Sequence, residues 1–488
     1  MGATREIAEW AATVRYEDIP ERVHDRTKAQ FASVLGAIHA GRHSEAAQAA
    51  LETTRSFGTP PEATVFATGE RLGRLDAIFA NAAYSVAFDF DDYLFAGHTG
   101  HSAVCASLAY GEHLGSSGRD VLAAAAVANE VGGRLGAALL LGPHNGQMWA
   151  YIHLLEGACA VGRLLGLDAG RIANAIGVAF TQPVYPLMPA FMGPDSKLLI
   201  PSSTTVEGAK AAEFAARGWT GSNVILEDRQ GFLRKYNPNA FGWMLSGFGT
   251  AWVSDSLSYK VVPGCAYIDT AVDAMHEIFT SFEADHGRKP NADDVDDIHV
   301  SCGLFTMGME TFAQTYRSPD RLEPITVNFS VALSFGLMLT AGALAPEFLS
   351  HKHLDANREE IEAVASKVRL EQTGEMDRRA SEASESGGFS LRSLISSSTP
   401  QSLDEASFEG YTMAFPAEVT FKTRDGKTYV ASQDVPFGAA GRPWDETREA
   451  VREKFRANYP GDTGPALDAI ERLVEASDIR ELVSLLGP

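Results

Sequence analysis

The pattern of apolar and polar positions changes along the chain. From Tyr16 to about Ser256 it reads as a succession of helices rich in small residues, which pack closely against one another. This half of the chain is therefore expected to be predominantly α-helical. The helices are expected over residues 25–40, 72–88, 102–114, 119–141, 157–165, 171–180 and 206–217.

After Lys260 several runs alternate apolar and polar residues with the period of two that is typical of strands. Asp425-Gly426 lies between two such runs and indicates a hairpin turn. Together with helices expected over 271–283 and 329–341, these strands predict a smaller α+β domain. The strands are expected over residues 297–302, 367–371, 417–422 and 428–432.

These patterns divide the chain into three segments and predict a fold that is mainly α with a smaller α+β domain. Residues 1–258 are expected to form a helical domain, and residues 259–435 the α+β domain. Helical periodicity returns in 436–488, which we expect to pack back on the helical domain. A Ser-rich stretch near 380–407 has little pattern and is expected to be a long surface loop.

Composition narrows the classes of function. With 488 residues and 45% hydrophobic content, the chain can bury large cores. Its formal net charge of -22 argues against nucleic acid or an anionic membrane as a partner, because phosphate binding needs a basic face. A small anionic substrate remains compatible, since a few buried cations can set the potential of a cleft.

Neither a membrane segment nor a disulfide scaffold is indicated. Charged residues interrupt the long apolar stretches, and the N-terminus has no apolar stretch of the kind found in export signals. A cytoplasmic protein with reduced thiols is therefore expected. The four cysteines are widely spaced, without a zinc-finger pattern: Cys105, Cys159, Cys265 and Cys302.

One short segment concentrates titratable groups between apolar helices. Asp89-Phe90-Asp91-Asp92 is followed closely by His98 and His101. Clustered carboxylates raise one another's pKa, and a neighbouring histidine can hold a proton near neutral pH, as general acid-base catalysis requires. Two other interpretations stay open: Asp91 or Asp92 could cap a helix, and the cluster could bind zinc or manganese, although its spacing matches no strong metal motif.

The same segment resembles a known family. Asp89-Phe90-Asp91-Asp92 and Gly97-His98 are similar to the D-F-D-D and G-H-P signatures of MmgE/PrpD proteins. Further similarities follow in the same order and extend over nearly the whole chain. They include Leu164–Asp168, Gly193–Lys197, Tyr259-Lys260, Asn328–Ser330 and Gly441–Pro443.

This resemblance implies a fold and a class of chemistry. The family includes 2-methylcitrate dehydratase, cis-aconitate decarboxylase and iminodisuccinate epimerase, whose members share a large helical domain, a smaller α+β lid and a homodimeric assembly. They need no cofactor. We therefore expect a cofactor-independent lyase, a dehydratase or decarboxylase, that acts on a small carboxylate. An isomerase or epimerase on the same fold is the alternative.

Carried over position by position, the resemblance assigns catalytic roles to Asp89, His98, Lys197 and Lys260. In this hypothesis His98, oriented by Asp89, moves a proton at carbon, while the two lysines stabilise the developing negative charge. The lid would exclude water during the step. Lys197 could instead be an ordinary surface lysine paired with Asp195.

The chain also departs from the family pattern. Gln147 replaces a common histidine, Tyr93 a common threonine, and Ile200 another histidine, while Leu333 stands where the decarboxylase has a tyrosine. A smaller or less polar acid than the familiar tricarboxylates is therefore expected. His144, His101 and Tyr151 could substitute for the lost polar groups. The substrate-binding positions that we expect are Tyr93, His101, Gln147 and Cys265.

Two interpretations compete with these roles. Cys265 could be a small buried apolar residue and no more. The lost polar groups would also fit a non-catalytic, dimeric ligand-binding protein built on the same fold.

Overall fold

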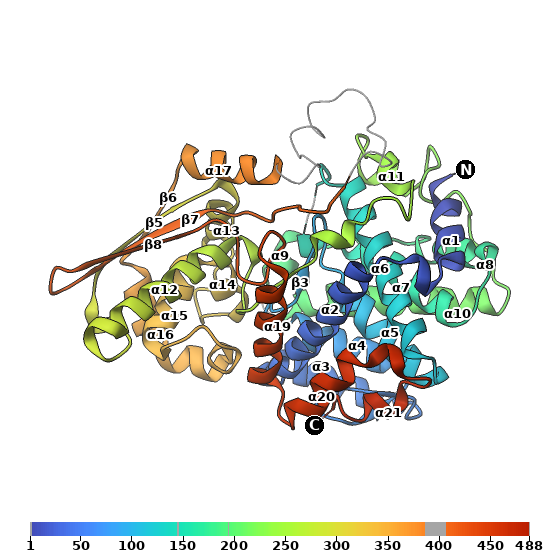
Figure 1. Ribbon diagram of the computed structural model, residues 1–488, viewed down its shortest axis with the longest axis horizontal. Helices are drawn as coiled ribbons and strands as arrows, with labels where there is room; N and C mark the ends of the chain where they lie inside the picture. Colours follow the sequence, from blue (N-terminus) through green and yellow to red (C-terminus); the bar gives the residue numbers. More distant parts are fainter. Residues whose placement is uncertain (1, 144–145, 194, 386–406, 488) are drawn as a thin grey trace.

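The computed structural model describes residues 2–143, 146–193, 195–385 and 407–487. A helical body and a smaller α+β lid lie side by side, and the fold class expected from the sequence is confirmed (Figure 1). The helices of the body are α1 (Ala3–Thr13), α2 (Glu21–Ala40), α3 (Glu45–Arg55), α4 (Arg74–Val86), α5 (Gly100–Leu114), α6 (Gly118–Ala138), α7 (Ala150–Leu164), α8 (Ala169–Ala179), α9 (Met188–Phe191), α10 (Leu199–Ala216) and α11 (Phe232–Tyr236).

Small residues let the helices of the body approach closely. Where α7 meets α10, Gly157 faces Gly208, and a methyl group added to Gly208 would lie 2.4 Å from the carbonyl oxygen of Leu154. Two of these helices differ most from expectation, because α7 begins at Ala150 instead of 157 and α10 at Leu199 instead of 206. Pro201 lies in the first turn of α10, where its missing N–H has no intrahelical partner to lose.

The lid contains a four-stranded mixed sheet in the order β6-β5-β7-β8. The expected hairpin is present as β7 and β8, and β5 pairs with β7 antiparallel and with β6 parallel. The helix α12 packs on β7 and β8. The lid elements are β5 (Val295–Cys302), β6 (Val368–Gln372), β7 (Ala417–Thr423), β8 (Thr428–Gln433), α12 (Asp269–His286), α13 (Leu304–Thr315), α14 (Pro324–Phe329), α15 (Val331–Ala341), α16 (His351–Ala365) and α17 (Gly374–Glu385).

The prediction of a loop near 380–407 is wrong at its start, because helix α17 extends to Glu385. Arg378 forms ion pairs with Glu375 and Glu382, three positions before it and four after it, and such pairs support an exposed helix. Residues 386–406 lie outside the part of the chain that the structure describes.

Among the C-terminal helices, α19 packs against α2 of the body. Lys454 of α19 donates to Ser33 Oγ of α2 at 2.9 Å and to the carbonyl oxygen of Phe90 at 2.6 Å. The domain limits at residues 258 and 435 stay a prediction. These helices are α19 (Trp444–Asn458), α20 (Thr463–Glu471) and α21 (Arg480–Val483).

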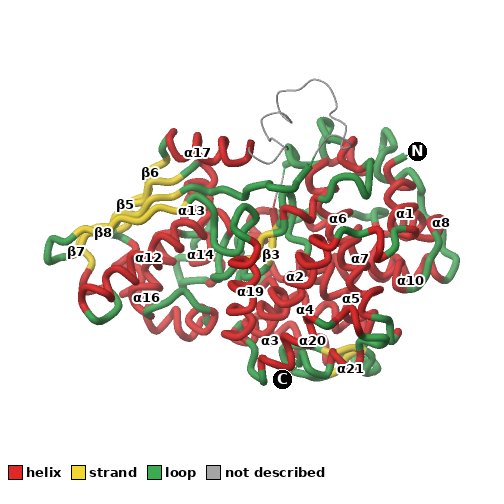
Figure 2. The backbone as a smooth tube through the Cα atoms, viewed as in Figure 1, coloured by secondary structure: helices red, strands yellow, loops and turns green. Residues whose placement is uncertain are grey.

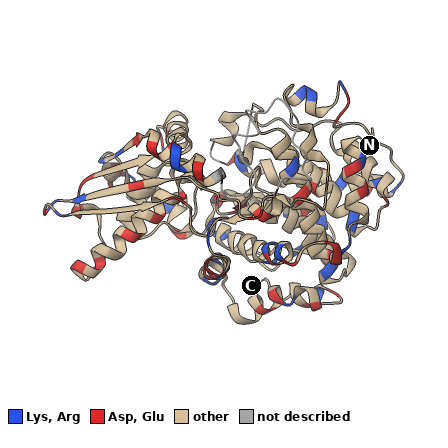
Figure 3. Ribbon diagram, turned by 45° about the horizontal axis from the view of Figure 1, so that its top comes forward, with Lys and Arg blue, Asp and Glu red and all other residues tan. Residues whose placement is uncertain are grey.

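The body and the lid meet along the segment that contains the clustered aspartates. The short strand β3 (Asp92–Tyr93) pairs with β4 (Ser258–Tyr259) in the interior, between the helices of the two parts (Figure 2). Charged residues are spread over both parts and also occur where the parts meet (Figure 3). Among the helices that the structure describes, none is long and apolar enough to cross a membrane.

Candidate active site

The loop between α4 and β3 alternates apolar and acidic side chains. Phe88 and Phe90 insert into the hydrophobic core that includes the lid sheet, while the intervening Asp89 and Asp91 are fully buried among polar partners. Asp89 has a φ of 54°, in the left-handed region that non-glycine residues rarely adopt. Such strain is typical of residues that the surrounding structure holds in place for function.

Asp91 is the centre of the polar cluster. One of its carboxylate oxygens, Oδ2, accepts from His98 Nδ1 at 2.6 Å and from His101 Nε2 at 3.0 Å. The other, Oδ1, accepts from Lys260 Nζ at 2.6 Å, and Gln147 Nε2 lies 3.1 Å from both oxygens. Asp91 therefore orients His98, and the expectation that Asp89 does so is wrong.

Asp89 instead binds the two lysines. Lys197 Nζ donates to its Oδ1 at 2.8 Å, and Lys260 Nζ lies 3.4 Å from the same oxygen while donating to the Asp89 carbonyl at 2.9 Å. Lys197 is only 3% exposed, which excludes the surface-lysine interpretation and its pairing with Asp195. The structure thus brings Asp89, His98, Lys197 and Lys260, the four expected catalytic residues, together.

The hydrogen bonds leave few atoms free for a substrate. Lys260 directs its ammonium hydrogens at Asp89 and Asp91, and both ring nitrogens of His101 are engaged, since Nδ1 lies 2.7 Å from Ser85 Oγ. Lys197 has a single hydrogen-bond acceptor among the described residues, and its ammonium also lies about 5 Å from two phenylalanine rings. His98 is the most exposed member of the cluster, and its Nε2 has no partner in the described part of the chain.

Burial and pairing set the protonation states of the cluster. Burial alone would raise the pKa of Asp91, but Lys260, His98 and His101 together hold that pKa well below its usual range. Burial also opposes the charge of Lys260, yet Asp89 and Asp91 raise the pKa of its ammonium. Burial lowers the pKa of Lys197 against the opposing effect of Asp89. Asp91 is therefore an anion that can stabilise a proton on His98.

Asp92 has a structural role. Gln30 donates to its Oδ2 at 2.7 Å, and the residue is fully buried. Burial and the nearby charge of Asp91 raise the pKa of its carboxyl group. Neither aspartate caps a helix, so that interpretation of Asp91 and Asp92 is wrong.

The remaining substrate-binding candidates, Tyr93 and Cys265, have different surroundings. The ring of Tyr93 lies 6.1 Å from that of His98, and the buried Tyr93 hydroxyl lacks a partner among the residues described. Cys265 belongs to an apolar group with Phe191, Ile200 and Phe329, and burial raises the pKa of its thiol. These contacts favour the interpretation of Cys265 as a buried apolar residue.

The proposed substitutes for the lost polar groups differ in position. The Tyr151 ring packs against Tyr236 and Phe232. Leu333, which stands where the decarboxylase has a tyrosine, lies in the lid core. His144 lies outside the described residues. Among the residues that are described, no three or more His, Cys, Asp or Glu side chains are arranged to hold a metal ion.

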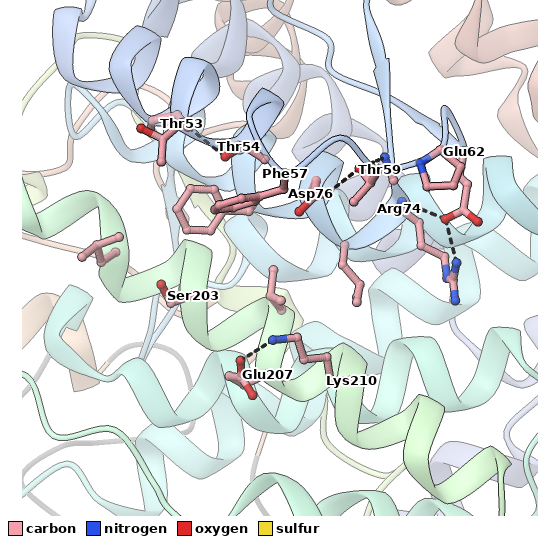
Figure 4. A pocket seen from close by; sticks show the side chains of 17 residues that line it. Thr53, Thr54, Phe57, Thr59, Glu62, Arg74, Asp76, Ser203, Glu207 and Lys210 are labelled. Atoms are coloured by element: carbon pink, nitrogen blue, oxygen red, sulfur yellow. Dashed lines mark hydrogen bonds and ion pairs between the residues drawn. The ribbon is translucent and has the colours of Figure 1, made fainter.

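A narrow gap, too small in this conformation to hold a water molecule, lies beside the cluster, and a much larger pocket lies elsewhere. The gap is lined by Val86, His101, Gln147, His153, Lys197, Ile200 and Pro201. The larger pocket, about 740 Å³, is a groove between the loop after α3 and helix α10, with its polar groups paired among themselves (Figure 4). It contains none of the expected site residues, so we place the candidate site at the gap.

Two buried polar residues near the gap were not predicted from the sequence. His153 and Glu156 lie three positions apart in the otherwise apolar helix α7, next to Ser102 of α5. Polar residues spaced in this way within an apolar helix share one face, and this spacing was the signal available in the sequence.

Comparison with known proteins shows what the chain is similar to. The model of the MmgE/PrpD N-terminal domain matches residues 5–241, which include Asp89, His98 and Lys197. This segment is an MmgE/PrpD N-terminal domain. A cis-aconitate decarboxylase from Aspergillus terreus (strain NIH 2624 / FGSC A1156) is 27% identical over 295 residues, and a second Aspergillus terreus cis-aconitate decarboxylase matches equally. The match covers 57% of this chain and 60% of the length of each relative. The MmgE/PrpD resemblance expected from the sequence is thus confirmed.

Proposed function

We propose that this protein is a cofactor-independent lyase that acts on a small carboxylate, and specifically a decarboxylase. The observation that carries the proposal is the pairing of His98 with Asp91, which leaves His98 Nε2 without a partner among the described residues. Asp91 also accepts from Gln147, which lines the gap together with Lys197. The similarity of the chain to cis-aconitate decarboxylases supports the same class of reaction.

In the proposed decarboxylation, Lys197, His98 and Asp91 each have a distinct role. Lys197 binds a carboxylate of the substrate and stabilises the charge that develops near it. The bond to the departing carboxylate breaks, carbon dioxide leaves, and the electron pair stays on the substrate carbon. His98 then delivers a proton from Nε2 to that carbon, while Asp91 stabilises its protonated form. A proton from solvent restores His98.

The number of unpartnered imidazole nitrogens within the Asp91 cluster favours decarboxylation over dehydration. Dehydration needs a base for the C–H proton and an acid for the leaving hydroxyl group, whereas decarboxylation needs a proton donor alone. In the Asp91 cluster, both nitrogens of His101 are engaged and His98 has a free one. Epimerisation also requires removal and return of a proton, so dehydratase and epimerase activity remain the alternatives.

Incubation with a set of carboxylates in D₂O, followed by NMR, tests this proposal. The set includes cis-aconitate, 2-methylcitrate and short unsaturated dicarboxylates. We expect one acid to lose carbon dioxide and to gain one deuterium at the carbon that lost it. Lys197→Met should abolish this reaction, whereas Lys210→Met should leave it unchanged, because Lys210 is a partly exposed residue of helix α10, which begins just after Lys197.

The other outcomes contradict the proposal in different ways. Loss of water without carbon dioxide would identify a dehydratase, and deuterium exchange without bond cleavage would identify an epimerase. Saturable binding with no chemical change to any acid would identify a non-catalytic binding protein.

A further inference from the structure

A second buried polar group adjoins the site. His153 Nδ1 lies 2.7 Å from Ser102 Oγ, which also hydrogen-bonds Glu156 Oε2, and all three residues are at most 1% exposed. The residues come from α5 and α7, which pack together. Burying three polar side chains is unfavourable unless they bond one another, as these do.

The neighbouring helix makes room for this group. Gly132 of α6 faces Glu156, and a methyl group at this position would lie 1.7 Å from Glu156 Oε1. A larger residue at position 132 would therefore force the Glu156 carboxyl group to move. Glu156 Oε1 has no hydrogen-bond partner in the described part of the chain, which is far less unfavourable for a neutral acid than for an anion.

Burial favours one direction for these hydrogen bonds. It raises the pKa of Glu156 well above its usual range and lowers the pKa of His153 well below its usual range, and so favours the neutral form of both groups. A neutral Glu156 can donate to Ser102 Oγ, which then donates to His153 Nδ1. In this arrangement the proton of the His153 ring lies on Nε2.

His153 also lines the gap beside Lys197, and no described residue accepts from its Nε2. The other gap histidine, His101, has both nitrogens engaged. We propose that His153 is a substrate-binding residue that donates from Nε2 to a carboxylate oxygen of the substrate, beside the ammonium of Lys197. The proposal rests on the proposed function in that the gap must widen to admit a carboxylate.

The rest of the gap indicates the class of substrate. Ile200 and Pro201 give it an apolar side, and the gap is narrow. A neutral imidazole N–H next to an ammonium binds a carboxylate without adding a second charge. The geometry therefore favours a short dicarboxylate with an apolar side, and maleate is a simple probe of that class.

Two matched substitutions at His153 distinguish the roles of its two ring nitrogens. In His153→Asn the amide can replace Nδ1 toward Ser102 but does not reach the gap, whereas in His153→Gln the amide can replace Nε2. We expect His153→Asn to weaken maleate binding about tenfold in calorimetry, and His153→Gln to recover most of the affinity. His113→Asn, in the last turn of α5, is the control and should bind like the wild type. With an identified substrate, His153→Asn should raise KM and leave kcat nearly unchanged.

A spectroscopic measurement tests the hydrogen-bond direction in the absence of substrate. In protein labelled with ¹⁵N-histidine, we expect His153 to carry its proton on Nε2 from pH 6 to pH 8. Ser102→Ala should shift its signal, whereas His113→Asn should not.

The results distinguish this inference from the proposed function. Loss of maleate binding in His153→Asn supports the inference even if the wild type transforms no acid. Unchanged maleate affinity in His153→Asn, a proton on Nδ1, or no binding of maleate by the wild type would overturn it, even if decarboxylation is observed.

Discussion

The two lysines of the site differ in how their hydrogens are used. Lys260 is completely buried and donates to Asp91 and to the Asp89 carbonyl, whereas Lys197 has one carboxylate partner, Asp89. Lys260 therefore holds the two aspartates in position, and Lys197 remains available to a ligand. The sequence assigned equivalent roles to both.

This difference predicts unequal effects on stability. Lys260→Met leaves Asp91 buried with its main cationic partner removed, and we expect the free energy of unfolding to fall by about 3–5 kcal/mol. Lys197→Met should lower it less, because Lys260 still lies near Asp89. Urea unfolding of both variants measures the difference. A larger loss in Lys197→Met than in Lys260→Met would contradict this assignment.

The residues of the site could largely be predicted from the sequence, but their pairing could not. Asp89, His98, Lys197 and Lys260 converge as the family signature implied. The choice of Asp91 over Asp89 as the partner of His98 depends on the left-handed backbone at Asp89, which turns adjacent side chains in directions that no motif specifies.

Helix α10 shows how an element positions the site. It carries Ile200 at its start, next to Lys197, and packs along α7 through Gly208 and Gly157. This close contact connects the gap to the rigid interior of the body.

We expect Gly208→Ala to disturb that contact. Its methyl group would lie 2.4 Å from the Leu154 carbonyl oxygen and 3.1 Å from the Cα of Gly157, so overpacking should lower the free energy of unfolding by about 1–3 kcal/mol. Gly374→Ala, at the open start of α17, is the matched control and should be neutral or slightly stabilising. Thermal or urea unfolding compares the two, and equal stability of both variants would contradict the close packing of α7 and α10.

Helix α19 contributes a buried amine to the site. Burial lowers the pKa of Lys454 to about 7, against the opposing effect of Asp91 and Asp92, while the unfolded chain binds this proton up to a pH of about 10.4. The unfolded state thus binds more protons between these values, and stability from this group rises with pH in that window. The difference in free energy of unfolding between wild type and Lys454→Met should therefore increase from pH 7 to pH 10. A difference that is flat or falls with pH, in urea titrations at several pH values, would contradict a depressed pKa.

At the scale of the whole molecule, periodicity predicted the division between helical body and lid sheet. The hairpin of β7 and β8 followed from alternation around Asp425-Gly426. The pairing of β3 with β4 could not be predicted, because each strand has two residues and the partners are more than 160 positions apart. The extension of α17 was missed because its polar side chains support the helix through ion pairs instead of a buried face.

The homodimer implied by the family resemblance stays a prediction. Light scattering coupled to size-exclusion chromatography should give about twice the 52.3 kDa mass of the chain. A mass that stays at that of one chain over a range of concentrations would contradict it.

The proposed mechanism assigns proton delivery to His98, whereas His101 only supports Asp91. The direct test compares kcat of His98→Asn and His101→Asn on the acid that the wild type decarboxylates. We predict that His98→Asn lowers kcat by about 10²- to 10⁴-fold with little change in KM, and that His101→Asn lowers kcat much less. Wild-type kcat in His98→Asn, or a greater loss in His101→Asn than in His98→Asn, would contradict the account.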